Sequence, residues 1–128
     1  MKLFTLIAGI LLFLQDFTDR DLMGTWKWVK SSGGMLGIET TAEKSGVSRT
    51  ISFSRDHVAL FYVGDSLTFK NNFFILQEKT IFSEQPENVL KIKGTLKSQS
   101  IDFIGKDTLI LRENAFDGFT HTYVRSSH

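Results

Sequence analysis

From Leu22 onward, apolar and polar residues alternate with a period of two rather than with the 3.6-residue period of an amphipathic helix. The clearest runs are RTISFS (49–54), DSLTFK (65–70), NVLKIKGTL (88–96) and FTHTYVR (119–125). β-Branched and aromatic residues dominate them, which is typical of strands. No helical stretch separates the runs, so parallel β-α-β units are excluded and the chain is predicted to be all-β and antiparallel.

Short turn signals separate the runs at the spacing expected of consecutive hairpins. They include Asn71-Asn72 and the corner from Gln85 to Asn88, which holds the only proline. We count eight or nine strands. Sequential antiparallel strands lose their exposed edges by closing into an up-and-down β-barrel, and a barrel of about eight strands either fills with side chains or holds one small ligand.

One connection is long and rich in glycine. It runs from Lys30 to Gly46 with little alternation. Loops of this length are uncommon in compact domains and often act as lids or binding loops. We therefore expect the segment from Ser31 to Gly46 to be a loop over one end of the barrel.

The N-terminus resembles an export signal. Lys2 precedes an almost unbroken apolar run from Leu3 to Leu14, which is too short to cross a membrane as a helix but suits the core of a signal peptide. No small-x-small cleavage triplet follows, so an uncleaved anchor or a helix packed on the domain stays open. Residues 1–18 are predicted to be a signal peptide or apolar helix, and residues 19–128 a barrel domain. We expect a secreted or periplasmic protein whose only membrane contact is residues 1–18, if uncleaved.

Composition and motifs exclude several classes of function. The net charge is +1, and scattered Lys and Arg argue against a nucleic-acid partner. The chain has no cysteine, which excludes disulfides and thiol chemistry. Neither a G-x-S-x-G elbow, an H-E-x-x-H helix, an EF-hand loop nor a P-loop occurs. We therefore expect no enzyme activity, no catalytic residues, no metal and no cofactor.

Two tryptophans stand two residues apart at the start of the first predicted strand. The triplet Gly24-Thr25-Trp26, with Arg125 near the end of the last strand, resembles the calycin signature. The wider pattern is similar to small bacterial secreted lipocalin-like proteins, through WKWVKSSGG, FSRD, IGKDTLIL and DGFTHTYVR in this order.

That resemblance implies how the barrel closes. Trp26 would lie across one end, and Arg125 would pack over it and hydrogen-bond the backbone of the first strand. Gly24, Trp26 and Arg125 are thus the expected closure residues, while Trp28 shares the face of Trp26. Members of this group often carry a lipid-attachment cysteine, which this chain lacks, and the chain is shorter than a full lipocalin, so any cavity should be small.

Alternation also gives the candidate ligand-binding residues. The strand residues predicted to point inward are Phe53, Phe61, Leu67, Phe69, Phe74, Leu76, Leu90 and Ile92. Phe73 and Phe74 fall on opposite faces, so one of them must face outward. His121 and Tyr123 share the face of Arg125. Of these residues, we expect Trp28, Phe53, Phe61, Phe69, Phe74, Leu76, Ile92, His121 and Tyr123 to contact a ligand.

Two hypotheses follow. In the first, the barrel binds a small apolar or amphipathic molecule inside, with His121 as a polar anchor for an acidic or hydroxylated group. His121 bonded only to a backbone carbonyl is the structural alternative. In the second, the barrel is filled and binds another protein, for example as an inhibitor, through its outer surface or the segment from Ser31 to Gly46.

Overall fold

The computed structural model describes residues 19–126, which form one antiparallel sheet with two short helices. The helices are α2 (Asp19–Leu22) and α3 (Ala42–Ser45). The strands are β1 (Gly24–Gly33), β2 (Ile38–Thr41), β3 (Arg49–Phe53), β4 (Val58–Val63), β5 (Ser66–Thr80), β6 (Ser83–Ile92), β7 (Ser98–Ile104), β8 (Thr108–Glu113) and β9 (Phe119–Arg125). The predicted signal segment, residues 1–18, and His128 lie outside the described residues.

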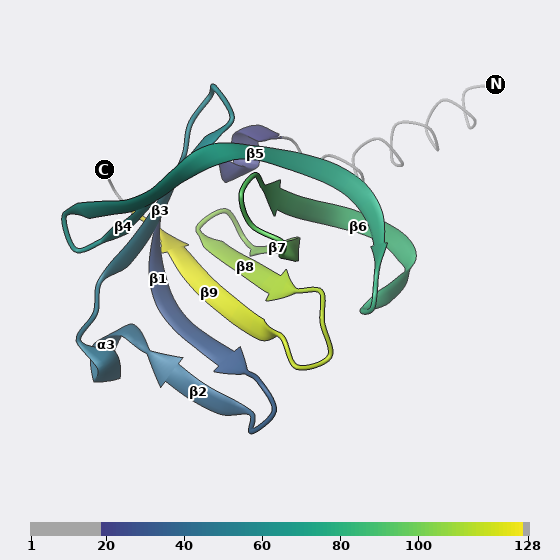
Figure 1. The fold of residues 1–128 in the computed structure, drawn as a ribbon, viewed down its shortest axis with the longest axis horizontal. Coiled ribbons are helices and arrows are strands. Elements are labelled where there is room, and N and C mark those ends of the chain that lie inside the picture. Colours follow the sequence, from purple (N-terminus) through teal and green to yellow (C-terminus); the bar gives the residue numbers. More distant parts are fainter. Residues whose placement is uncertain (1–18, 127–128) are drawn as a thin grey trace.

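The sheet closes on itself because β1 pairs with strands on both of its sides (Figure 1). The order is β2-β1-β3-β4-β5-β6-β7-β8-β9, and β1 also pairs with β9. Residues Gly24 to Lys27 of β1 pair with β3, while Lys30 to Gly33 pair with β2. Eight strands therefore form a closed barrel, and β2 is an additional ninth strand. The predicted all-β, up-and-down barrel is confirmed.

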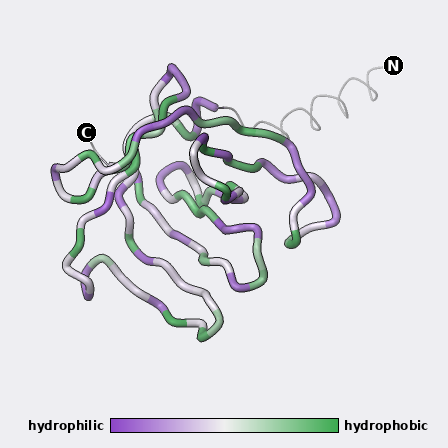
Figure 2. The backbone as a smooth tube through the Cα atoms, in the orientation of Figure 1, coloured by the Kyte–Doolittle hydropathy of each residue, from purple (hydrophilic) through white to green (hydrophobic). Residues whose placement is uncertain are grey.

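Hydrophobic and hydrophilic residues are interspersed along the strands (Figure 2), and the buried hydrophobic residues of most strands form a common core. The buried cluster consists of Leu22, Trp26, Ile51, Phe53, Ala59, Phe73, Leu90, Ile92, Ile101, Leu109 and Leu111. Phe61, Phe69, Ile75, Phe103, Met23 and Tyr123 are partly buried and pack against it. Phe53, Phe61, Phe69, Leu90 and Ile92 thus point inward as the alternation predicts.

The predicted inward orientation of Phe74 and Leu76 is wrong, because both side chains face outward. Their side chains are 51% and 43% exposed, whereas Phe73 is fully buried. The predicted turn at Asn71-Asn72 does not exist: β5 runs through it without interruption from Ser66 to Thr80. Without a turn the phase of the alternation is kept, so Phe69, Phe73 and Ile75 share the inner face.

Leu67 is also exposed, although it was predicted to point inward. On β4 and β5, Phe61 is opposite Phe69 but Tyr62 is opposite Leu67, so Thr68 is an extra residue. Such a β-bulge reverses the face of every residue beyond it. Leu67 therefore points to the side opposite Phe69.

The predicted corner from Gln85 to Asn88 is likewise part of a strand, β6. Pro86 has no backbone N–H that could donate a hydrogen bond to a neighbouring strand. Proline in a sheet is therefore confined to positions where one side of the strand is unpaired. β6 pairs with β7 only from Val89 to Lys91. Pro86 lies before this range, where β7 makes no ladder to β6.

The glycine-rich segment is a hairpin and a helical turn rather than a lid loop. Lys30 to Gly33 pair with Ile38 to Thr41, and α3 follows at once. The Thr41 hydroxyl caps α3 by accepting a hydrogen bond from the Lys44 N–H at 3.0 Å. At Gly33, with φ of 129°, a Cβ atom would lie 2.4 Å from the Gly118 carbonyl oxygen. Glycine there lets the β1–β2 and β8–β9 turns touch.

Trp26 and Arg125 close one end of the barrel, as the resemblance implies. They are opposite each other on β1 and β9, and the Arg125 guanidinium lies 4.2 Å from the centroid of the fully buried indole. Arg125 Nη1 donates to the Met23 carbonyl at 2.8 Å, and Nη2 donates to that of Asp21 at 2.9 Å. A Cβ atom on Gly24 would lie 3.1 Å from Nη1, so glycine leaves room for the guanidinium. We call this the Trp26 end.

Replacing Trp26 with alanine is expected to lower the free energy of unfolding by about 3–5 kcal/mol, the usual range for a buried tryptophan. The loss combines apolar burial with the cation–π contact and the 2.8 Å hydrogen bond from Nε1 to the Leu22 carbonyl. Urea denaturation followed by circular dichroism measures it. The exposed neighbour Lys27→Ala is the control and should change stability by no more than about 0.5 kcal/mol. A loss below about 1 kcal/mol for Trp26→Ala contradicts the closure role.

The course of β5 gives a second, matched prediction. Phe73→Ala should destabilise the fold by about 3–5 kcal/mol, because it opens a cavity in the core. Phe74→Ala, one residue further on the outer face, should cost less than about 1 kcal/mol. Urea denaturation of both variants side by side measures the difference. Equal losses of stability would show that the inner face of β5 is assigned wrongly.

Candidate functional site

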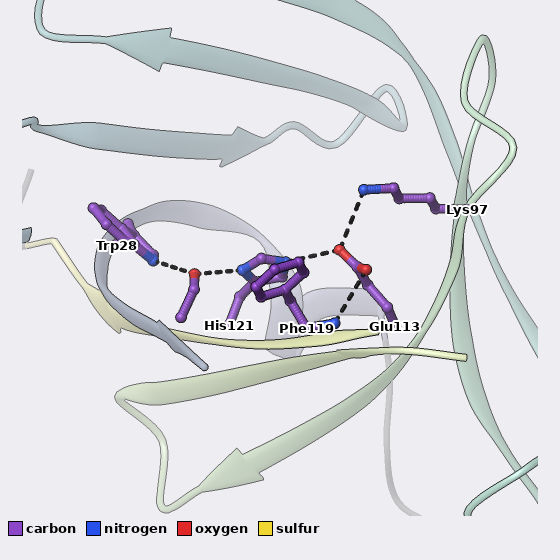
Figure 3. A network of polar contacts seen from close by, with 6 residues as sticks. Trp28, Lys97, Glu113, Phe119 and His121 are labelled. Carbon is purple, nitrogen blue, oxygen red and sulfur yellow. Dashed lines mark hydrogen bonds and ion pairs between the residues drawn. The ribbon is translucent and has the colours of Figure 1, made fainter. Parts of the chain in front are cut away.

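A connected set of side chains on the inner face of β1, β8 and β9, away from the Trp26 end, is joined by Lys97 from the β6–β7 connection (Figure 3). Trp28 Nε1 lies 2.8 Å from Ser31 Oγ, which lies 2.5 Å from His121 Nδ1. His121 Nε2 lies 3.0 Å from Glu113 Oε2, and Lys97 Nζ lies 3.4 Å from the same oxygen. We call these residues the polar network.

A β-bulge brings Ser31 into the polar network. Trp28 is opposite Tyr123, but the register shifts at Val29, so that Lys30 is opposite Thr122 and Ser31 is opposite His121. Strict alternation from Trp26 and Trp28 would turn Lys30 inward. Because a bulge redirects the side chains that follow it, Ser31 takes that position and Lys30 is exposed.

Glu113 is the charged centre of the polar network. It continues the inner face of Leu109 and Leu111 on β8, and it is only 9% exposed. Burial raises the pKa of its carboxyl, but the hydrogen bonds from His121 and from the Phe119 N–H and the charge of Lys97 outweigh it and leave the pKa below its ordinary value. Glu113 is thus a buried carboxylate that stays ionised at neutral pH.

The ionised carboxylate fixes the direction of the hydrogen bond that it shares with His121. It accepts only, so His121 Nε2 carries a proton and donates to it. His121 Nδ1 and the Ser31 hydroxyl share a hydrogen bond whose donor is set by which ring nitrogens carry a proton. The Ser31 oxygen in turn accepts from Trp28 Nε1, which is a donor only. An unbroken series of hydrogen bonds therefore joins Trp28 to Glu113 through Ser31 and His121.

Two further residues flank the polar network. The Arg49 guanidinium lies 5.1 Å from the centroid of the Trp28 ring. Tyr123 stands on β9 two residues from His121, on the same face. Burial raises the pKa of Tyr123 to about 12, with Arg49 lowering it and Glu113 raising it further. Its hydroxyl is therefore protonated at neutral pH.

The predicted ligand residues fall into three groups. Trp28, Phe53 and Ile92 are buried on the inner face. Phe61 and Phe69 face inward, pack edge to face at 5.7 Å between centroids and are partly buried. His121 and Tyr123 lie in or beside the polar network, and His121 bonds side chains rather than a backbone carbonyl. Phe74 and Leu76 are outside the barrel. Whether the inner residues contact a ligand stays a prediction.

Sequence reasoning missed Ser31, Glu113, Lys97 and Arg49. For Glu113 a signal was present, because TLILRE alternates Leu109, Leu111 and Glu113 on one face. Ser31 carried no such signal, since the bulge at Val29 leaves no mark in the residue pattern. Arg49 is the first residue of β3, and Lys97 lies in the connection between β6 and β7. Alternation within a strand does not predict the contacts of side chains at such positions.

Neither a metal-binding cluster nor a membrane-spanning helix is found among residues 19–126. Within residues 19–126, no three histidine, aspartate or glutamate side chains are grouped so that they could hold a metal ion. Over the same range, no helix has the length and apolar character needed to cross a membrane.

Comparisons with known proteins give distant likenesses to solved structures alone. No protein-family model matches the sequence, and no curated protein matches it either. A solved structure of a Schistosoma mansoni fatty acid-binding protein in complex with arachidonic acid is similar at 21% sequence identity and a TM-score of 0.37. The match covers 84% of this chain and 97% of that one. A likeness this loose supports no conclusion about function.

The lowered pKa of Glu113 predicts how stability depends on pH. A carboxyl whose folded pKa lies below its unfolded value stabilises the fold fully above the ordinary value of 4.5 and loses this effect as the pH falls through the folded pKa. Unfolding free energies of the wild type and Glu113→Gln, measured by urea denaturation at pH of about 6 and about 3, should therefore differ less at the lower pH. The exposed Glu84→Gln is the control. A difference that stays constant or grows on acidification contradicts the assignment.

Proposed function

We propose that this protein is an exported lipocalin-like barrel that binds a small hydrophobic or amphipathic molecule in its interior without a chemical step. The observation that carries the proposal is that the inner face is fully covered at Trp26 and Trp28 and is exposed further along, at His121 and Phe119. Trp26 is 0% and Trp28 4% exposed, whereas the His121 side chain is 22% and Phe119 40% exposed. A barrel closed at the Trp26 end and accessible at the other has the form of a ligand site.

The chemistry of the inner face suits such a ligand. Phe61 and Phe69 offer inward apolar surface that is not fully covered. The polar network adds a few fixed polar groups on the inner face of the same barrel. Ligand sites combine mostly apolar walls with a small number of placed polar groups, where the walls supply most of the binding energy and the polar groups set orientation.

Binding without chemistry is favoured by the surroundings of Ser31. Ser31, His121 and Glu113 follow one another like a nucleophile, a base and an acid, which is the arrangement of serine hydrolases. Such catalysis also needs free N–H groups for an oxyanion. At Ser31, however, β1 is paired on both sides, with Thr40 of β2 and His121 of β9. Its neighbouring N–H groups are thus committed to the sheet.

Export is supported by the sequence alone. Lys2 followed by the apolar run from Leu3 to Leu14 is the pattern of a signal peptide. The absence of cysteine fits a chain without a lipid anchor attached through that residue.

A second function, binding of another protein by the outer surface, is favoured by exposed apolar side chains. Met35, Leu36 and Ile38 on the β1–β2 hairpin are 89%, 83% and 57% exposed. Phe74 and Leu76 lie on the outer face of β5. Large exposed apolar side chains that gather in one place are common at interaction surfaces.

Native mass spectrometry of the protein isolated from its own host tests both functions and export. We expect a mature chain shortened by about the signal length and a co-purified small molecule that is released on unfolding. An environment-sensitive apolar fluorophore should bind the delipidated protein, and Phe61→Asp should weaken that binding more than the control Phe74→Asp on the outer face. A full-length chain contradicts export. No bound molecule, no fluorophore binding and a co-purified protein partner would favour the second function.

A further inference from the structure

We infer that three apolar turns, at the end of the barrel away from Trp26, dock on an electrically neutral, zwitterionic lipid surface. The inference goes beyond the proposed function, because it holds whether or not the barrel carries a ligand. It also adds a membrane contact to the one expected from residues 1–18. It is carried by large apolar side chains that protrude from turns whose backbone N–H groups are bonded within the protein.

The three turns meet away from the Trp26 end and lie along one side of the molecule (Figure 1). The β1–β2 turn touches the β8–β9 turn, since the Gly34 N–H donates to the Gly118 carbonyl at 3.4 Å. The β5–β6 turn joins them, since the Ile81 N–H donates to Asn114 Oδ1 at 2.9 Å. The exposed apolar side chains on and beside these turns form a group that we call the apolar rim: Met35, Leu36, Ile81, Phe82, Phe116 and Phe119.

The apolar rim borders the accessible part of the inner face. The Phe119 ring lies beside Gly34, where a Cβ atom would be 3.1 Å from it. The same ring stacks on His121 of the polar network, at 6.2 Å between ring centroids. Phe119 therefore connects the apolar rim with the side chains inside the barrel, so a surface that covers the rim also covers the accessible end.

The side chains at the tips of the apolar rim protrude into solvent. Leu36 is 83%, Met35 89% and Phe116 99% exposed. Large apolar side chains exposed together mark a surface that binds a protein or a membrane. The centre of a protein interface is packed as densely as a protein interior, whereas fluid acyl chains close around side chains that stand apart. Protrusion of this degree therefore favours a lipid surface over a protein surface.

The backbone of the three turns suits transfer out of water. An N–H group that leaves water without a partner costs free energy, so a segment that enters lipid needs its N–H groups satisfied within the protein. The Gly37 N–H is bonded inside the β1–β2 turn at 3.3 Å, and the Gly118 N–H inside the β8–β9 turn at 3.1 Å. In the β5–β6 turn, the Phe82 N–H donates to Thr80 Oγ1 at 3.1 Å. Together with the bonds between the turns, these contacts lower the cost of insertion.

The charges beside the apolar rim are paired, which selects the kind of lipid surface. Asp117 is the single charged residue within 34–37, 81–82 and 114–118. The Arg112 guanidinium stacks on the Phe82 ring at 5.0 Å. Ion pairs flank the rim: Lys79–Glu84 at 3.4 Å, Arg112–Asp102 at 3.8 Å and Lys97–Glu113 at 3.4 Å. Attraction to anionic lipid needs a cluster of unpaired cations. The balanced charges of the rim instead match a zwitterionic surface, and docking comes from apolar insertion.

Cysteine labelling tests the inference, because the chain has no cysteine of its own. An environment-sensitive fluorophore is attached at Leu36→Cys in the apolar rim or at Ile104→Cys. Ile104 is 64% exposed and precedes the β7–β8 turn, which lies at the Trp26 end because the Asp107 carbonyl accepts from the Arg125 N–H. With phosphatidylcholine vesicles, only the label at position 36 should shift to the blue and be quenched by brominated acyl chains. The position of the label separates docking by the rim from binding by the apolar run at residues 3–14.

Matched variants show whether the apolar rim drives docking. Phe116→Asp should weaken binding to these vesicles by about tenfold or more, the effect of withholding one large apolar side chain from lipid. Ile104→Asp makes a similar change at the Trp26 end and should alter binding by less than about twofold, because that side chain stays in water. Circular dichroism confirms that both variants are folded, and both should still bind the apolar fluorophore of the ligand assay.

Electrostatics and self-association give the remaining outcomes. Anionic phosphatidylglycerol in the vesicles, or NaCl raised from about 0.05 to about 0.5 M, should change the affinity by less than about twofold, because salt screens only charge-driven binding. A requirement for anionic lipid, equal responses of the two labels or equal losses in the two aspartate variants overturn the inference. A dimer that Phe116→Asp dissociates, without vesicle binding, overturns it in favour of a second copy. Vesicle binding without fluorophore binding leaves the inference standing while the proposed function fails.

Discussion

The contact between Trp26 and Arg125 is the constraint on which the rest of the structure depends. The two residues come from the first and the last strand of the barrel, and they are opposite each other only because the sheet closes. The guanidinium stacks on the indole and its donors satisfy carbonyl groups of the chain just before β1. One interaction thus covers apolar core at an open end, pairs backbone oxygens and joins the two ends of the sheet.

The same pairing of β1 and β9 builds the polar network. Ser31 and His121 are 90 residues apart in the chain, and they meet because the strands that carry Trp26 and Arg125 continue side by side. Glu113 joins from β8, the other neighbour of β9. Closure at the Trp26 end and the arrangement of polar groups further along therefore both result from the pairing of β1 with β9. A slip of this pairing by one residue would disturb both.

Alternation was sufficient to predict antiparallel strands and most inward residues, because both depend on a period of two over short stretches, whereas the closure by Trp26 and Arg125 came from the calycin resemblance. It failed where the period is interrupted without a sign in the residue types. Asn71-Asn72 looks like a turn but lies within β5, which reverses the faces given to Phe74 and Leu76. The bulge at Thr68 misplaces Leu67, and the glycines after Lys30 hide a hairpin held by pairing to Ile38 through Thr41. The bulge and the hairpin both depend on which strands pair with each other, and the local sequence does not indicate this pairing.

The bulge at Val29 shows most clearly how a small irregularity shapes the candidate site. Without it, Lys30 would take the inward position opposite His121, and an ammonium group would meet the imidazole and the Glu113 carboxylate. Lys30 would then neutralise Glu113 from inside the barrel. With the bulge, a neutral hydroxyl stands there and Lys30 points to solvent. The Glu113 carboxylate is instead paired with His121 and with Lys97, which reaches it from an exposed position. One extra residue in one strand therefore decides whether a hydroxyl or an ammonium group stands opposite His121 on the inner face.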